Sequence, residues 1–193
     1  MPSRRRFLAN GLATGVAALA APTLAAAQVK EFELAEPLRP RYVRTADEIT
    51  PGQIIVMPQK HFLYWVVEQN KAIRYGVGVG RAGLSFQGKA VVGRKAEWPS
   101  WRPTAAMIER NPQQYPKFVG DDDYIMPGGP GNPLGARALY LFKDGRDTYY
   151  RIHGTTQPES IGRSDSSGCI RMLNSHVKHL YDQVPVGTPV TVV

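Results

Sequence analysis

The sequence predicts a mainly β fold with two short helices, and two observations carry this prediction. After residue 50, short apolar runs rich in β-branched and aromatic residues alternate with turn residues such as Pro, Gly, Asn and Asp. Helix signals appear in only two places, around residues 104–110 and in the stretch that follows the single cysteine, Cys169. We therefore expect the cysteine to lie on a turn just before a packed helix.

The predicted strands are short, and two pairs of them are expected to form hairpins. Gln69-Asn70-Lys71 supplies the turn of the first hairpin, and Asp144-Gly145 supplies the turn of the second. The predicted strands span residues 53–57, 62–67, 72–79, 138–142, 148–153 and 189–193.

The two predicted helices differ in their signals. Thr104 is a plausible cap for the first, which is stopped by Asn111-Pro112. Asn174 is the expected cap of the second. Its apolar stripe repeats at i, i+3, i+4 and i+7 and should pack on the sheet, while its polar face should meet solvent. The stripe consists of Val177, Leu180, Tyr181 and Val184, and the polar face of His176, Lys178, His179 and Asp182.

The first 27 residues have the pattern of an export signal. Three arginines at 4–6 and Phe7-Leu8 resemble a twin-arginine signal, and an ordinary secretory signal is the alternative. An apolar run interrupted by Gly and Pro follows, too short for the ~20 residues of a membrane span. Ala25-Ala26-Ala27 fits cleavage before Gln28. We expect an exported protein of the periplasm or cell envelope, with an extended arm at 28–50 and a catalytic domain at 51–193.

The net charge of the chain indicates which classes of binding partner to expect. The whole chain has a formal charge of +8. Removal of residues 1–27 takes away three arginines and no acid, which leaves +5 on 166 residues. The remaining Lys and Arg are scattered, and together with export this argues against a nucleic-acid partner. A polyanionic cell wall or a substrate with carboxylates fits better.

Cys169 is the only cysteine, so it has no partner for a disulfide within the chain. In an exported protein this suggests a reactive thiol or an intermolecular bridge, and a buried cysteine acting as a small hydrophobe is the alternative. A thiol needs a base, and His153 at the end of a predicted strand is well placed to point into a cleft. Gly154 permits a sharp turn, and Gly168 frees backbone N–H groups for an oxyanion.

These residues resemble a known family. His153-Gly154-Thr155, Ser160-Ile161-Gly162 and Ser167-Gly168-Cys169-Ile170-Arg171-Met172 are similar to the active-site motif of the L,D-transpeptidases of the YkuD/ErfK type. The likeness extends over about residues 51–193. It implies a β-sandwich with short helices, one of which packs just after the cysteine.

The resemblance also implies an activity. Cys169 would be acylated by a tetrapeptide stem of peptidoglycan with release of terminal D-alanine, and the acyl group would pass to an amine to give a 3→3 cross-link. His153 would be the base, Gly154 would orient it, and Arg171 would organise the site or meet a substrate carboxylate. The amides of Gly168 and Cys169 would form the oxyanion hole. No metal or cofactor is implied, and carbapenem β-lactams are expected to acylate the thiol.

One position departs from the family pattern. Ser167 stands where the family more often has a histidine, which affects a secondary contact that the serine hydroxyl can partly replace. Three alternatives remain open: hydrolysis of the same acyl-enzyme by a carboxypeptidase or amidase, a general cysteine protease, and a non-catalytic wall-binding module. The sequence leaves the acceptor amine and the oligomeric state undetermined.

Other patterns are given structural interpretations. His176-x-x-His179 with Asp182 is expected to be a solvated helix face rather than a metal site. Asp121-Asp122-Asp123 lacks the spacing of a calcium loop. Gly76-x-Gly78-x-Gly80 does not open a predicted helix, so it is not a dinucleotide motif.

Overall fold

The computed structural model describes residues 32–193. The predicted export signal and residues 28–31 of the predicted arm lie outside the described residues. Within residues 32–193, no helix is long and apolar enough to cross a membrane.

One nine-stranded sheet dominates the fold, in the order β1-β4-β3-β2-β11-β6-β7-β8-β10, and β5 and β9 form a separate pair. The pairs β2–β11, β8–β10 and β5–β9 are parallel and the others are antiparallel. The strands are β1 (Arg41–Arg44), β2 (Ile54–Met57), β3 (Phe62–Glu68), β4 (Lys71–Gly76), β5 (Val79–Gly80), β6 (Gly88–Glu97), β7 (Arg137–Lys143), β8 (Arg146–His153), β9 (Ser164–Ser166), β10 (Ile170–Arg171) and β11 (Pro189–Val192).

Between residues 32 and 193, two α-helices accompany the sheet, α1 (Ala105–Arg110) and α2 (Asn174–Gln183). Five single turns of 3₁₀ helix lie at Glu36–Leu38, Pro58–Lys60, Pro112–Gln114, Pro116–Phe118 and Pro158–Ser160. Each of these turns has a proline in its first two positions, where the missing N–H costs nothing.

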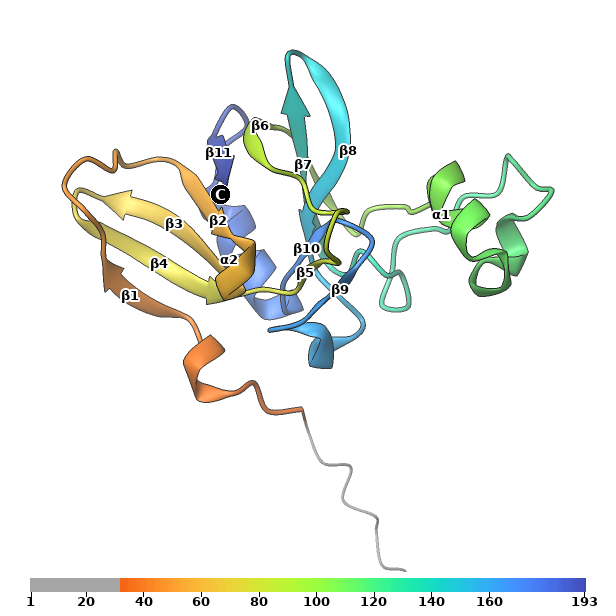
Figure 1. Ribbon diagram of the computed structural model, residues 1–193, viewed down its shortest axis with the longest axis horizontal. Coiled ribbons are helices and arrows are strands. Elements are labelled where there is room, and N and C mark those ends of the chain that lie inside the picture. The colour runs from red at the N-terminus through yellow and green to blue at the C-terminus, as the bar shows by residue number, and fades with distance from the viewer. Residues whose placement is uncertain (1–31) are drawn as a thin grey trace, which may run out of the picture. The chain divides into compact units, whose positions relative to one another are not determined.

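The sheet encloses a single hydrophobic core. Strand β11 joins the half made of β1 to β4 to the half made of β6, β7, β8 and β10 (Figure 1). Side chains from both halves meet in the core, for example Leu63 of β3, Leu139 of β7 and Ile152 of β8, all fully buried. Leu180 of α2 is buried with them. The predicted mainly β fold, with a helix packed just after Cys169, is confirmed.

Both predicted hairpins are present, and their turns explain why. Asn70 between β3 and β4 has φ = 61°. Asp144 and Gly145 between β7 and β8 have φ = 50° and 73°, and positive φ at both positions is the requirement of the two-residue turn that Asp-Gly favours.

Four strands were not predicted. Two of them, β9 and β10, are only three and two residues long and lie on either side of the turn that carries Cys169. Strand β6 has few apolar residues, and its β structure depends on pairing with β11 on one side and β7 on the other. Strand β1 lies inside the predicted arm and pairs antiparallel with β4. Residues 32–50 therefore contribute to the same sheet as residues 51–193.

The predicted strand at 72–79 is divided, and this is a correction. It is β4 up to Gly76 and β5 from Val79, and β5 pairs with β9 instead of β3. A Cβ added to Gly76 would lie 2.6 Å from Leu38, and one added to Gly78 would lie 2.5 Å from the Ser160 carbonyl. These glycines therefore permit close backbone packing, and none of them opens a helix.

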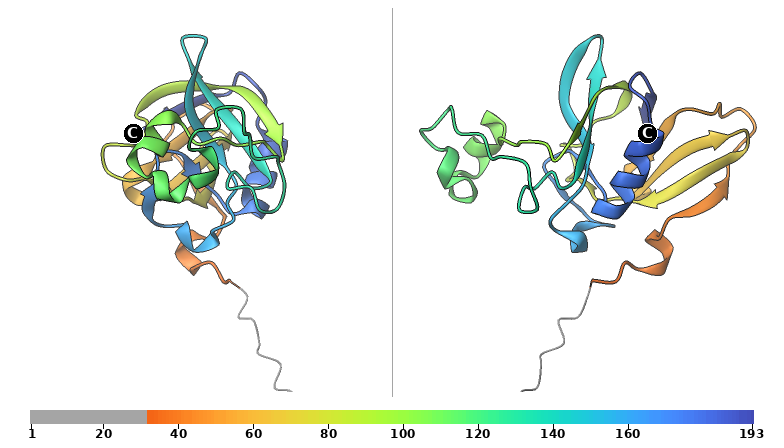
Figure 2. Two further views of the ribbon diagram at one scale, coloured as in Figure 1. Left: turned by 90° about the vertical axis from the view of Figure 1, so that its right-hand side faces the viewer. Right: turned by 180° about the vertical axis from the view of Figure 1, so that it is seen from behind.

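Residues 98–136 form a lobe between β6 and β7 that projects from the sheet (Figure 2). Helix α1 begins there as predicted, since the Thr104 hydroxyl accepts the Met107 N–H at 3.3 Å. Asp121 caps a turn by accepting the N–H groups of Asp123 and Tyr124. An aromatic cluster holds the lobe together and consists of Trp101, Tyr115, Phe118 and Tyr124.

One expectation for α2 was wrong. Asn174 makes no capping hydrogen bond, because its side chain is used elsewhere, as described below. The polar face is mostly solvated as expected, since Lys178, His179 and Asp182 are exposed. His176 is half-buried, and His179 Nδ1 lies 2.7 Å from the hydroxyl of the fully buried Tyr75. Tyr75 extends from β4 toward α2 and needs a polar partner there.

Candidate active site

Parallel pairing of β8 and β10 brings the two halves of the motif together. Ile170 lies beside Ile152, and Arg171 lies beside His153. Both isoleucines face the core, so alternation places His153, Arg171 and Cys169 on the opposite face. That face is away from α2, which packs on the core side of β7 and β8.

His153 is buried and has a fixed orientation. Its side chain is 4% exposed, and Nδ1 lies 2.5 Å from the carbonyl oxygen of Gly154. Nδ1–H donates in this pair, which leaves the lone pair on Nε2 free to accept a proton. Burial lowers the pKa of His153 to about 4, and Arg171 and Arg151 add to the effect, although the carbonyls of Gly154 and Leu134 oppose it.

Ser166 closes the turn that carries the cysteine. Its hydroxyl donates to the Cys169 carbonyl at 2.7 Å and accepts the Gly168 N–H at 3.1 Å. Gly168 has φ = 129°, and a Cβ there would lie 2.7 Å from both the Leu84 carbonyl and the Tyr150 ring. Only glycine fits this position, and the neighbouring Ser167 is exposed.

Cys169 is partly exposed, and the pKa of its thiol is raised above the ordinary value. Burial of the thiol raises its pKa, while the Arg151 amide and the guanidinium groups of Arg151 and Arg171 act in the opposite direction. Sγ lies 4.0 Å from the Tyr149 carbonyl oxygen, and no hydrogen bond links it to His153 within residues 32–193. The contact between a nucleophile and its base is often long in the free enzyme and tightens only when substrate binds.

Asn174 fixes the loop after His153. Its Oδ1 accepts the Ala136 N–H at 2.9 Å, and its Nδ2 donates to the Thr155 carbonyl at 3.1 Å. A Cβ on Gly154 would lie 2.1 Å from that Oδ1. Gly154 is therefore required for this packing as well as for its carbonyl contact with His153.

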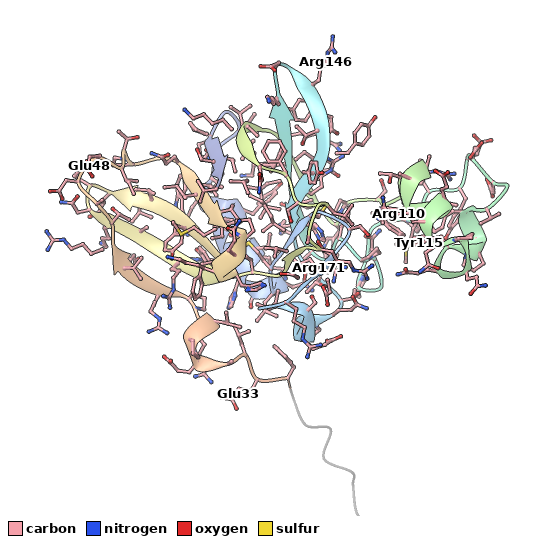
Figure 3. The ribbon with its side chains drawn as sticks, in the orientation of Figure 1. Glu33, Glu48, Arg110, Tyr115, Arg146 and Arg171 are labelled. Carbon is pink, nitrogen blue, oxygen red and sulfur yellow. The ribbon has the colours of Figure 1, made fainter. Side chains whose placement is uncertain are left out.

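The guanidinium group of Arg171 already has partners within the protein. This group pairs with Asp165 at 3.2 Å and donates to Gln157 at 3.4 Å (Arg171 is labelled in Figure 3). Its backbone exchanges hydrogen bonds with Gly78 in both directions. Of the two roles expected for Arg171, these contacts favour organisation of the site.

A cavity of about 560 Å³ lies next to the turn that carries Cys169. Gly80 is part of its wall and also abuts Gly168, because a Cβ on Gly80 would lie 2.8 Å from the Gly168 Cα. Its polar lining is uncharged and consists of Gln59, Ser85, Gln87 and Ser164. Within residues 32–193, no three His, Cys, Asp or Glu side chains gather as a metal ion requires.

The lowered pKa of His153 predicts how acylation depends on pH. An ordinary histidine is mostly protonated below pH 6.5, but His153 should stay a neutral base down to about pH 4. The acid limb of kcat/KM should therefore lie near pH 4, measured by stopped-flow acylation from pH 3.5 to 8. An acid limb of kcat/KM between pH 6 and 7 would contradict the lowered pKa of His153.

The same pKa shift affects folding. In the unfolded chain the imidazole of His153 takes up a proton near pH 6.5, so the free energy of unfolding should fall as pH drops from 6.5 toward 4.

The family model of the L,D-transpeptidase catalytic domain, YkuD, matches residues 51–192. This chain belongs to that family.

A similar curated protein has a name from the same family. The "Probable L,D-transpeptidase ErfK/SrfK" of Escherichia coli (strain K12) is 33% identical over 156 residues, which are 80% of this chain and 47% of that protein. The chain thus spans about half the length of this relative.

Solved structures share the fold. A Brucella melitensis crystal structure described as a probable carnitine operon oxidoreductase caia is 51% identical, with a TM-score of 0.55 over 83% of this chain and 96% of that one. The NMR structure of the catalytic domain from an E. faecium L,D-transpeptidase acylated by ertapenem has a TM-score of 0.51 over 76% of this chain and 99% of that one, at 21% identity. At that identity the likeness shows the fold alone.

Proposed function

We propose that this protein is a peptidoglycan L,D-transpeptidase that uses Cys169 as nucleophile and His153 as general base. The observation that carries the proposal is the β8–β10 register, which sets both side chains on one face of the sheet within a domain of this family. The substrate would be a tetrapeptide stem, and the product a 3→3 cross-link. Export to the periplasm or cell envelope through residues 1–27 belongs to the same proposal.

The first half of the reaction acylates the enzyme. Sγ of Cys169 attacks the carbonyl carbon before the terminal D-alanine while its proton passes to Nε2 of His153. The C–N bond then breaks, and His153 returns the proton to the departing D-alanine amine. The products are a thioester on Cys169 and free D-alanine.

The second half transfers the acyl group. An acceptor amine attacks the thioester carbonyl and gives a proton to His153, and the C–S bond breaks as the new amide forms. That proton then restores the Cys169 thiol. The chemistry needs only protein groups, and water in place of the amine would make the enzyme a carboxypeptidase.

The oxyanion hole would differ from the expectation. Ser166 already holds the Gly168 N–H, whereas the Cys169 N–H has no partner in the described part of the chain. The Cys169 N–H is thus the better donor to an oxyanion. Gly168 would contribute by the shape of the turn, and the exposed Ser167 hydroxyl would be free to meet substrate.

The test is incubation of the purified protein with a disaccharide tetrapeptide, followed by mass spectrometry of products and enzyme. A thioester adduct on the protein, free D-alanine and a dimer of stems would support the transpeptidase. Tripeptide without dimer would favour the hydrolytic alternative. No adduct and no product would contradict the proposed function and favour the wall-binding module.

Carbapenems should acylate Cys169. A thiol positioned for a peptide carbonyl should also open a strained β-lactam ring, and a related fold has been solved acylated by ertapenem. Intact-mass analysis should show one adduct, mapped by digestion to the peptide with Cys169 and absent from Cys169→Ala. No adduct at millimolar drug, in a preparation that turns over tetrapeptide, would contradict this.

A further inference from the structure

A row of side chains crosses the sheet on the face that carries His153. Arg94 of β6 lies beside Tyr140 of β7, which lies beside Arg151 of β8. The register of β10 against β8 continues the row to Cys169. Both guanidinium groups stack on Tyr140, that of Arg94 at 3.7 Å and that of Arg151 at 4.4 Å from the ring centroid. Arg151 is thus the cation between this ring and the nucleophile.

Arg151 is held in a single place by Asp147. Its Nη1 and Nη2 donate to the two carboxylate oxygens at 2.7 and 2.9 Å, a bidentate pair. The two side chains are only 13% and 31% exposed. Nη1 also donates to the Tyr150 carbonyl at 3.1 Å. With its fork used by Asp147, Arg151 is not free to bind a substrate carboxylate in the same way.

The same carboxylate also holds a bulge in β8. Only one residue of β7 lies between Tyr140 and Phe142, whereas three residues of β8 lie between their partners Arg151 and Asp147. Tyr149 lies in this bulge with φ = 62°, a conformation that is strained for a residue with a side chain. Its N–H donates to Asp147 Oδ1 at 2.8 Å, which keeps it there.

The bulge is in contact with the nucleophile. The Tyr149 carbonyl oxygen lies 4.0 Å from Cys169 Sγ. The backbone conformation that Asp147 fixes therefore also determines which atoms surround the thiol. The Tyr149 ring is 70% exposed, so the contact to the thiol comes from backbone and not from a packed side chain.

We propose that Asp147 and Arg151 are positioning residues for Cys169, which fix the bulge at Tyr149 and through it the place of the thiol. The inference rests on the proposed function, since it concerns the thiol of that acyl transfer. Neither side chain touches the reacting atoms in the proposed reaction. Both hold the backbone of β8, and the charge of Arg151 also acts on the thiol.

The charges around the thiol agree with this role. Burial raises the pKa of Cys169, the amide and the cation of Arg151 lower it, Arg171 also lowers it, and Asp147 raises it. Both cations are paired with a carboxylate, Arg171 with Asp165 and Arg151 with Asp147. Arg151 is the one whose partner also holds the bulge, so its loss should change both the position and the ionisation of the thiol.

The test uses Arg151→Met and Asp147→Ala in the full-length protein. Each substitution should lower the maximal acylation rate on the order of 10²-fold and change KM little. A displacement of the reacting thiol by about 1 Å has an effect of that size. The double variant should be no slower than either single one, because the two residues act as a unit. The pH profile of iodoacetamide alkylation should move to higher pH in Arg151→Met.

Two further variants separate the possible causes. Arg151→Lys keeps the charge but loses the bidentate fork, so it should restore the alkylation profile and leave acylation slow. Arg94→Met removes the other cation from Tyr140 without touching the bulge, so it should keep the wild-type rate and profile. Circular dichroism and melting identify variants that fail to fold, and Asp147→Asn then replaces Asp147→Ala.

Some outcomes would overturn the inference. Wild-type acylation and alkylation in Asp147→Ala and Arg151→Met would do so, as would an equal loss in Arg94→Met. Complete rescue of acylation by Arg151→Lys would show a purely electrostatic effect. If the wild type itself forms no acyl-enzyme, the proposed function fails, whereas the alkylation profiles still test the positioning of the thiol.

Discussion

Cys169→Ala is expected to abolish acyl transfer and leave the fold intact. The side chain is small, partly exposed and at the end of a turn held by Ser166, so its truncation should cost no more than about 1 kcal/mol of stability. Without Sγ no thioester can form, and no other cysteine exists to replace it. The assay is mass spectrometry of enzyme and products with disaccharide tetrapeptide, alongside thermal melting.

A second substitution controls for shape. Cys169→Ser is nearly isosteric, so it should melt with the wild type, and its weaker nucleophile should leave little acylation. Acyl transfer retained by purified Cys169→Ala would refute the assignment of Cys169 as nucleophile. A large drop in melting temperature for Cys169→Ala would instead show that the residue serves packing.

His153→Ala is expected to slow acylation by about 10²–10⁴-fold, the usual effect of losing a general base. The other three imidazoles of residues 32–193 have other surroundings: His61 lies 2.9 Å from the Ser164 hydroxyl, and His176 and His179 belong to α2. The measurement is the single-turnover rate of thioester formation. Since His153 is buried, its removal should also lower the melting temperature, and rates are compared well below that temperature.

His179→Ala is the matched control. It removes the same ring and leaves the hydroxyl of buried Tyr75 without its partner, so it should cost about 1–3 kcal/mol of stability and leave acylation nearly unchanged. His176→Ala should also leave acylation nearly unchanged. A loss of activity from either variant as large as that from His153→Ala would revive the idea of a metal site on α2.

The sequence determined the features that depend on local chemistry. Asp144-Gly145 and Asn70 adopt positive φ in tight turns, which few other residues tolerate, so both hairpins could be predicted. Thr104 caps α1 through a bond three residues away. His153, Gly168 and Cys169 stood out because few functions require these residues at that spacing, and the family match agrees with that interpretation.

Tertiary structure decided what depends on residues far apart in the chain. Strand β6 exists because β11 and β7 pair with its two edges, which no local pattern in 88–97 shows. Asn174 had the signal of a helix cap, but Ala136 and Thr155 approach it in the fold and take both ends of its amide. A local preference worth about 1 kcal/mol gives way when distant groups offer two hydrogen bonds.

The surroundings of the thiol show the same division. Asp147 and Arg151 are four residues apart, a spacing that is common in any sequence. In a regular strand their side chains would be too far apart along the strand to pair. The bulge at Tyr149 brings them together, and it is set by the pairing of β8 with β7. The sequence thus predicts Sγ of Cys169 as the nucleophile. The groups that surround this thiol depend on the folded sheet, because strand register is a property of several segments at once.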